Sequence, residues 1–395
     1  MHTRASILFV LSFLASGFIV ACGGAGSSVT PIPTPVTPAA SGYFPYTQGW
    51  LGADGAYSIP IGTNQSVWIF ADTFVGASNA TTRSSSTALV HNTIGISTGS
   101  GSNITLQYYW PGMGTSSPGP VFAAPGTDWF WPMDGFTYNG TLYVALMQMY
   151  STGSGGVFGF AYAGSQLASI GNYTASPSQW VITYQQLNTG GSAVPGVSIV
   201  ANQGPNGNPN PADPQGASYA YFFTGAGSTP DLSLLRIPLT QLNSLARPGN
   251  TSWQYLNTSG GWEAWQDTAT TLPGDSAVVI NPGATEMTVR YHVSTNQWIA
   301  VYPYGLENQA FYSISSSLTS GWGPMESLYS YPEMQPGNAN YTPSVFCYAA
   351  KEHVEFETAG QLFFTYACNS TVVSDVTNNM NLYHPVVVTQ ALPSN

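Results

Sequence analysis

The sequence predicts an all-β fold, a five-bladed β-propeller, on three observations. The chain of 395 residues contains 43 Gly and 29 Pro, so turn-forming residues occur throughout it. Short runs rich in β-branched and aromatic residues lie between these turns, and no apolar pattern with a helical period extends beyond about two turns. Five successive segments also repeat one order of features: a polar or acidic residue, a strand, a tight turn and a second strand ending in aromatic residues. Such a repeat is typical of propeller blades.

The five units follow one another along the chain, and we expect four strands in each. The first covers residues 49–110, and the second opens at Trp131-Pro-Met-Asp-Gly135 and turns at Asn139-Gly140. The third begins near Val197 and contains the Asn- and Pro-rich tract 201–214, which must be a loop because proline removes ladder donors. The fourth covers 285–324 and the last covers 346–388.

The N-terminal residues predict export and anchoring. Residues 1–21 have a basic start and a short apolar core, which is typical of a signal peptide rather than a membrane span. They end in Ile19-Val-Ala-Cys22, which resembles a bacterial lipobox, so Cys22 is the expected site of lipidation; an ordinary secretory peptide is the alternative. Residues 22–41 are rich in Gly, Ser, Thr and Pro and predict an extended tether. The single propeller domain is then 42–395, in a bacterial cell envelope.

The charge of the chain limits the classes of partner that we expect. Lys and Arg together number six, Asp and Glu 17, and the net charge is −11. A chain without a basic surface cannot neutralise phosphates, so nucleic acid is not an expected partner. The sequence also lacks a nucleophile elbow, a phosphate-binding loop, a zinc-spaced cluster and a dinucleotide fingerprint. We therefore expect no cofactor and no metal, and a monomer.

The most informative segment is a predicted hairpin near the start of the domain. Strands over 56–61 and 66–74 flank the turn Gly62-Thr-Asn-Gln65. Folding about this turn brings Asp54 and Asp72 to within about one residue of register. A slip of one residue would send them to opposite faces, so the register decides whether they meet.

Acidic residues recur where the inner strands of a propeller converge on its axis. Paired carboxylates in such a funnel can cleave a glycosidic bond, one as an acid and the other as a nucleophile or base. Asp54 and Asp72 are the candidate catalytic pair. An Asp before Gly is also a common turn residue, so a structural role stays open for Asp54 and Asp134. The remaining candidates, for substrate binding or for tuning a pKa, are Asp134, Glu286, Arg290, Glu352, His353, His91 and Trp131.

Two of these candidates lie on a strand with alternating character. Glu286, Thr288, Arg290 and His292 would share one face, which predicts either a polar channel wall or a solvated edge. Lys351 could form an ion pair with the neighbouring Glu352. His353, Glu355 and Glu357 share a period of two and could bind a metal, although a solvated hairpin fits the same pattern.

The last unit contains two cysteines, Cys347 and Cys368. They lie in consecutive predicted strands, nearly symmetric about the turn Glu357-Thr-Ala-Gly360. In an exported protein this placement predicts a disulfide, with two separate buried thiols as the alternative.

Several motifs resemble a known family. Gly52-Ala-Asp-Gly-Ala56 with Val67-Trp-Ile-Phe-Ala-Asp-Thr-Phe74 resembles the paired opening motif of the bacterial domain-of-unknown-function family 4185. Further similarities are Leu89-Val-His-Asn-Thr93, Ala350-Lys-Glu-His353 and Tyr383-His-Pro-Val-Val387. Ala71 departs from the usual Gly, and Val354 from the usual Pro.

The resemblance implies a five-bladed propeller of the glycoside hydrolase type, in a group that includes endo-D-arabinanases. It also implies that Asp54 and Asp72 are the catalytic pair. The sequence thus favours an extracytoplasmic glycoside hydrolase acting on a polysaccharide or oligosaccharide, with arabinan-like chains as one class. A noncatalytic glycan-binding lipoprotein is the main alternative, and a structural or adhesive surface protein is the third. The separation of the two carboxyl groups distinguishes the first two.

Overall fold

The computed structural model describes residues 42–83, 87–100, 103–154, 158–188, 190–201, 219–226, 230–244, 252–265 and 271–393. The predictions for the signal peptide, Cys22 and the tether lie outside these ranges, as does most of the 201–214 tract. Within them the chain is nearly all β, with one α-helix, α1 (Val373–Asn378). None of the helices in the described ranges has the length and apolar character needed to cross a membrane.

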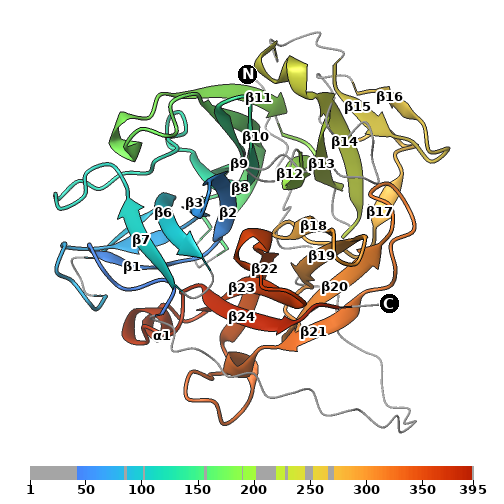
Figure 1. The fold of residues 1–395 in the computed structure, drawn as a ribbon. Helices are drawn as coiled ribbons and strands as arrows, with labels where there is room; N and C mark the ends of the chain where they lie inside the picture. Colours follow the sequence, from blue (N-terminus) through green and yellow to red (C-terminus); the bar gives the residue numbers. More distant parts are fainter. Residues whose placement is uncertain are drawn as a thin grey trace, which may run out of the picture.

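Five antiparallel sheets surround a central axis, as the propeller prediction requires (Figure 1). The first and second sheets have four strands each, in the order of a blade. They are formed by β2 (Tyr57–Gly62), β3 (Gln65–Phe70), β6 (Thr93–Ser100) and β7 (Asn103–Tyr109), and by β8 (Trp129–Tyr138), β9 (Thr141–Ser151), β10 (Phe160–Ile170) and β11 (Ile182–Asn188).

The third sheet is larger than a standard blade, because an additional hairpin extends it and a further strand pairs with β14. Its strands are β12 (Ala193–Val200), β13 (Tyr219–Ala226), β14 (Leu232–Pro238), β15 (Gln254–Leu256), β16 (Trp262–Ala264) and β17 (Val278–Ile280). The fourth sheet has four strands: β18 (Thr288–His292), β19 (Gln297–Pro303), β20 (Gln309–Ser315) and β21 (Glu326–Ser330).

The last sheet has three strands in the described residues, and α1 lies in the connection between the second and the third. Its strands are β22 (Val345–Glu352), β23 (Gln361–Ser370) and β24 (Val386–Ala391). A sixth, small sheet contains β1 (Trp50–Ala53), β4 (Thr73–Val75) and β5 (Ala88–Val90). Short 3₁₀ turns occur at Pro177–Gln179, Leu239–Ser244, Pro332–Met334 and Val354–Phe356. The expectation of four strands in every blade is therefore wrong for the third and fifth units.

The inner strands β2, β8, β12, β18 and β22 contact one another in chain order around the axis. The ring closes between the last blade and the first, where Ser58 Oγ lies 2.7 Å from His353 Nδ1. At the same junction the ring of Trp68 stacks on that of Phe356, with centroids 5.1 Å apart. Buried aromatic rings of this kind supply most of the apolar contact between neighbouring blades. Closure brings the segments before each inner strand to one end of the axis.

Candidate active site

The predicted hairpin has the register that brings its two acids together. Tyr57 pairs with Ile69, and Ala53 pairs with Thr73, so Asp54 and Asp72 lie directly opposite each other. The backbone N–H of Asp54 donates to the carbonyl of Asp72 at 3.3 Å. One correction is needed: β3 ends at Phe70, and Thr73 begins a separate strand. Both carboxylates line the same cavity.

This cavity has a volume of about 450 Å³ and lies at the end of the axis where the inner strands begin. Its acidic lining residues are Asp54, Asp72 and Glu286, contributed by the first and fourth blades. The second and fifth blades contribute aromatic rings to the cavity wall. The aromatic lining residues are Trp129, Trp131, Phe158, Phe160, Phe346, Tyr348 and Tyr383.

Asp54 has the environment of a proton donor. Burial, followed by the negative charges of Asp72 and Glu286, raises the pKa of Asp54 from 3.8 to about 8. The hydroxyls of Tyr348 and Tyr383 donate to its Oδ2 at 2.5 and 3.1 Å and partly oppose this shift. Its Oδ1 is buried without a hydrogen-bond partner among the described residues. Asp54 is therefore protonated at neutral pH, with one oxygen left for a ligand.

Asp72 is held by different groups. His91 Nδ1 and Trp131 Nε1 lie 2.9 and 3.0 Å from its Oδ1. The His91 ring in turn stacks on Trp129, with centroids 4.7 Å apart and an angle of 14° between the planes. Because both contacts are made to Oδ1, Oδ2 has no hydrogen-bond partner in the described part of the chain. The carboxylate is thus oriented with one oxygen available to the cavity.

Glu286 is the third acid of the cavity, and its partner is the only lysine of the chain. Lys351 Nζ donates to Glu286 Oε1 at 3.3 Å and lies 4.5 Å from the ring centre of Tyr57. Burial lowers the pKa of Lys351, and the negative charge of Glu286 opposes that effect. The expected pairing of Lys351 with Glu352 is therefore wrong, because neighbours on a strand point to opposite faces.

Arg83 supports the tyrosine that contacts Asp54. Its buried guanidinium donates to backbone carbonyls, including those of Leu51 at 2.9 Å, Leu382 at 3.0 Å and Tyr383 at 3.1 Å. Tyr383 has a φ of 56°, a left-handed conformation that is costly for a tyrosine. Arg83 joins this strained loop to β1, which leads directly into Asp54.

Asp134 and Arg290 lie in the protein interior and do not line the cavity. Asp134 is fully buried and accepts two bonds from the Arg290 guanidinium, both at 2.9 Å. It also accepts hydrogen bonds from Ser198 Oγ and from the backbone of Ile199 and Gly135. This satisfied ion pair joins three inner strands, so the geometry gives both residues a structural position rather than contact with substrate.

Glu352 and His353 also lie away from the cavity. His353 is fully buried between Ser58 and Thr365, whose hydroxyls lie 2.7 and 2.8 Å from its two ring nitrogens. Burial lowers the pKa of His353 well below its usual range. Glu352 points toward His292. Of the nine predicted catalytic, binding and tuning residues, Asp54, Asp72, Glu286 and Trp131 line the cavity, and His91 contacts it through Asp72.

Sequence reasoning missed Tyr348, Tyr383, Trp129 and Phe160 as cavity residues. Tyr383 stands in a motif, Tyr383-His-Pro-Val-Val387, which was a usable signal. Trp129 stands two residues before the predicted Trp131 on the same strand, which was a second usable signal. Tyr348 and Phe160 have no local pattern that separates them from core aromatics, since 24 Tyr and 18 Phe occur in the chain.

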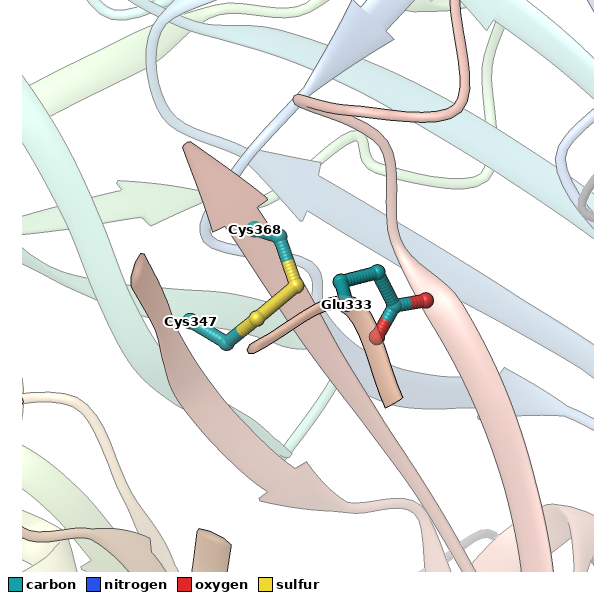
Figure 2. Close-up of side chains that lie close together, drawn as sticks. All are labelled: Glu333, Cys347 and Cys368. Atoms are coloured by element: carbon teal, nitrogen blue, oxygen red, sulfur yellow. A yellow bond between two sulfur atoms is a disulfide. The ribbon is translucent and has the colours of Figure 1, made fainter. Parts of the chain in front are cut away.

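The two cysteines of the last blade form a disulfide, Cys347–Cys368, between β22 and β23 (Figure 2). The carboxylate of Glu333 lies beside it and accepts a hydrogen bond from Tyr366 at 2.9 Å. Because the two sulfur atoms are bonded to each other, they are not thiolate ligands, and this group is not a metal site.

A comparison with known protein families identifies the family of this chain. The profile of the domain of unknown function DUF5005 matches residues 40–389. The chain belongs to this family. The more specific resemblance to family 4185 and to endo-arabinanases is not supported by this match. A search of curated proteins found no match.

Among the similar solved structures, one has a TM-score high enough to support the fold. A putative hydrolase from Bacteroides ovatus has a TM-score of 0.64 at 14% identity, over 86% of each chain. A GH43_1 enzyme from Xanthomonas citri has a TM-score of 0.40 at 11% identity, over 91% of this chain and 92% of its own. A xylan β-1,4-xylosidase from Bacillus halodurans has a TM-score of 0.40 at 11% identity, over 89% of this chain and 54% of its own. At these identities the similarity concerns the fold of the DUF5005 domain and not its chemistry.

Proposed function

We propose that this DUF5005 protein is a glycoside hydrolase in which Asp54 and Asp72 act on the glycosidic bond of a polysaccharide. The observation that carries the proposal is the contrast between two carboxyl groups in one cavity. Asp54 is buried beside two other acids and holds a proton, whereas Asp72 is oriented by an indole N–H and an imidazole. Two acids in such different environments have the division of roles that glycosidic cleavage requires.

In this reaction Asp54 donates its proton to the glycosidic oxygen as the bond from that oxygen to the anomeric carbon breaks. Asp72 then either attacks the anomeric carbon or takes a proton from the water that does so. The Tyr348 and Tyr383 hydroxyls stabilise the Asp54 carboxylate left after proton transfer, because both already donate to its Oδ2. Glu286 contributes a negative charge that favours the protonated form of Asp54 before the reaction.

Aromatic rings supply the binding surface for a sugar. Trp129, Trp131 and Phe160 lie on the wall of the second blade, and the edge-to-face pair Trp131–Phe160 has centroids 4.6 Å apart. Flat apolar rings beside a few fixed polar groups are typical of sites that bind neutral ligands. The substrate that we propose is a neutral polysaccharide, with arabinan-like chains as the first class to test.

The proposed location is the bacterial cell envelope, with the propeller attached through a lipid on Cys22. The Ile-Val-Ala-Cys sequence and the Pro/Thr-rich tether support this assignment. Changing Cys22 to Ser should move the exported protein from the membrane fraction to the soluble fraction. An unchanged distribution would show that Cys22 is not an anchor.

The test of activity is an assay of reducing-end release from a panel of arabinans, xylans and galactans, with the purified full chain. Asp54→Asn and Asp72→Asn should each reduce turnover by at least about 10³-fold, and the double variant should lose far less than the product of the two losses. Glu326→Gln is the matched control, because Glu326 lies on the outer strand β21 and bonds only Tyr312 among the described residues. It should retain full activity.

The outcomes separate catalysis from binding. If a substrate is cleaved and either aspartate variant keeps near-normal turnover, the catalytic assignment is wrong. If glycans bind but none is cleaved, and binding is unchanged in both variants, the protein is a glycan-binding lipoprotein instead. For any substrate that is cleaved, NMR measurement of the anomeric configuration of the product distinguishes retention from inversion.

A further inference from the structure

A second cluster of ionisable side chains lies away from the cavity, on the fourth and fifth blades. His292 is the last residue of β18. It lies four residues, or about 13 Å, along the strand from the first residue, Thr288. Its Nε2 lies 2.6 Å from Glu352 Oε1, and its Nδ1 lies 3.6 Å from Glu357 Oε2. One ligand atom from each of the three residues lies within 4.8 Å of the others.

Two members of this cluster, His292 and Glu352, have buried polar atoms without a hydrogen bond, whereas Glu357 accepts one from the backbone N–H of Phe363 at 3.3 Å. The side chains of His292 and Glu352 are 3% and 0% exposed. Both carboxylate oxygens of Glu352 and the Nε2 of His292 are buried without a hydrogen bond in the described part of the chain. The 2.6 Å contact between them is short, but it does not have the direction of a hydrogen bond. Buried carboxylates almost always have hydrogen bonds, a cationic partner or a metal ion.

The charge of the cluster is also unbalanced. Two carboxylates face one imidazole, and the nearby Arg290 guanidinium is already paired with Asp134. Placing two carboxylates against one imidazole in a buried site has an electrostatic cost. A bound cation would remove this cost without any change in the chain. Glu357 is 11% exposed, so the cluster has an opening to solvent.

We propose that His292, Glu352 and Glu357 bind one divalent transition-metal ion, of which Zn²⁺ and Mn²⁺ are the two candidates. One imidazole nitrogen and two carboxylate oxygens form a donor set that both ions accept, and water completes the coordination. The ion would join β18 to β22 and so connect the fourth blade to the fifth. This site is separate from the Asp54 cavity and does not depend on the proposed hydrolase activity.

The spacing in the sequence indicated a different set of three possible metal ligands. His353, Glu355 and Glu357 share a period of two, but His353 is bonded to Ser58 and Thr365, so its ring is not available. Glu355 is directed to the first blade, where Ser66 Oγ lies 3.3 Å from its Oε1. The histidine of the cluster comes instead from another blade, 60 residues earlier than Glu352, which no local pattern reveals.

The test uses the full chain without a polyhistidine tag, stripped with a chelator and then dialysed. ZnCl₂ or MnCl₂ is titrated by calorimetry, and metal retained after gel filtration is measured by mass spectrometry. We expect one ion per chain, and a melting temperature that rises by about 4 °C at a metal concentration of 100 times Kd. CaCl₂ is the comparison, and a preference for Ca²⁺ over both transition metals would overturn the assignment of the metal class.

Variants locate the ion. Glu352→Gln and His292→Gln should each weaken binding at least about 10-fold. Glu355→Gln is the matched control, because it removes a neighbouring charge without removing a ligand, and it should still bind one ion. Retained binding in both ligand variants, or no binding by the unmodified chain at millimolar metal, would refute the site. If the variants do not fold, Co²⁺ added to the unmodified chain gives an independent result, since its visible spectrum changes when protein ligands replace water, and an unchanged spectrum would refute the site.

Discussion

The pKa of Asp54 predicts a specific change in stability when this residue becomes asparagine. In the folded protein Asp54 keeps its proton up to a pKa of about 8, whereas in the unfolded chain the proton is lost near 3.8. Between these values the unfolded state is favoured by ionisation, so the free energy of unfolding falls as pH rises. The side chain in the Asp54→Asn variant cannot ionise, so its free energy of unfolding does not fall with pH for this reason. The stability of the variant relative to wild type should therefore increase from pH 4 to pH 8 and remain constant above it.

The magnitude follows from the shift. One pKa unit corresponds to about 1.4 kcal/mol, so a change from 3.8 to about 8 corresponds to about 6 kcal/mol at most. Water in the cavity lowers the cost of charging Asp54, and we expect a difference of about 2–4 kcal/mol. The two tyrosine donors remain in the variant, because an amide oxygen also accepts hydrogen bonds.

The assay is urea denaturation of wild type and Asp54→Asn at a series of pH values from 4 to 9. Other titrating groups affect both proteins, so the difference between the two curves isolates Asp54 and the groups coupled to it. The turnover of the variant should also be lower than that of wild type by at least about 10³-fold at every pH. Stability curves that run parallel within about 0.5 kcal/mol over the whole range would refute the raised pKa, and with it the role of Asp54 as the acid.

Three further predictions follow from the surroundings of the site. Tyr383→Phe removes a hydrogen bond that lowers the pKa of Asp54, so the loss of activity at alkaline pH should move to higher pH, by up to about one unit; an unchanged pH–rate profile would contradict this. Arg83→Met leaves several buried carbonyls without donors and should destabilise the fold by about 2–4 kcal/mol in urea, more than Arg83→Lys does. Cys347→Ser with Cys368→Ser opens a loop with a sequence separation of 21 and should cost about 3 kcal/mol by the same measurement, and equal stabilities would show that the disulfide does not constrain the unfolded chain.

Local pattern was sufficient where structure depends on neighbours along the chain. The hairpin with Asp54 and Asp72 and the turn at Asn139-Gly140 follow from turn chemistry and a period of two. The alternating strand is shorter than predicted, because β18 begins at Thr288 and Glu286 precedes it. The number of strands per blade did not follow, since no local pattern marked the additional hairpin β15–β16 of the third sheet or the three-stranded last sheet. The small sheet of β1, β4 and β5 did not follow either, because β1 pairs with residues 20 to 25 positions away.

The predicted motifs also separate what the sequence shows from what only the structure shows. In Leu89-Val-His-Asn-Thr93, His91 contacts Asp72, Asn92 bonds the backbone of Phe122 and Phe130, and the Thr93 hydroxyl lies 3.0 Å from that of Thr73. One motif therefore supports the candidate site in three ways. Its existence could be read from the sequence, but the partner of each member could not.

The sequence by itself determined that this chain forms an all-β propeller, that two aspartates share one hairpin end, and that two cysteines lie opposite each other. These features rest on local propensity, turn residues and symmetry about a turn. Only the tertiary structure decided which acids meet. Closure of the ring brings Glu286, Tyr348 and Tyr383 to Asp54, and it moves Asp134 and Glu352 into the interior. The reason is that a propeller joins residues far apart in the chain, such as Tyr383 and Asp54, which are 329 positions apart, and the direction of each side chain depends on how the blades pack.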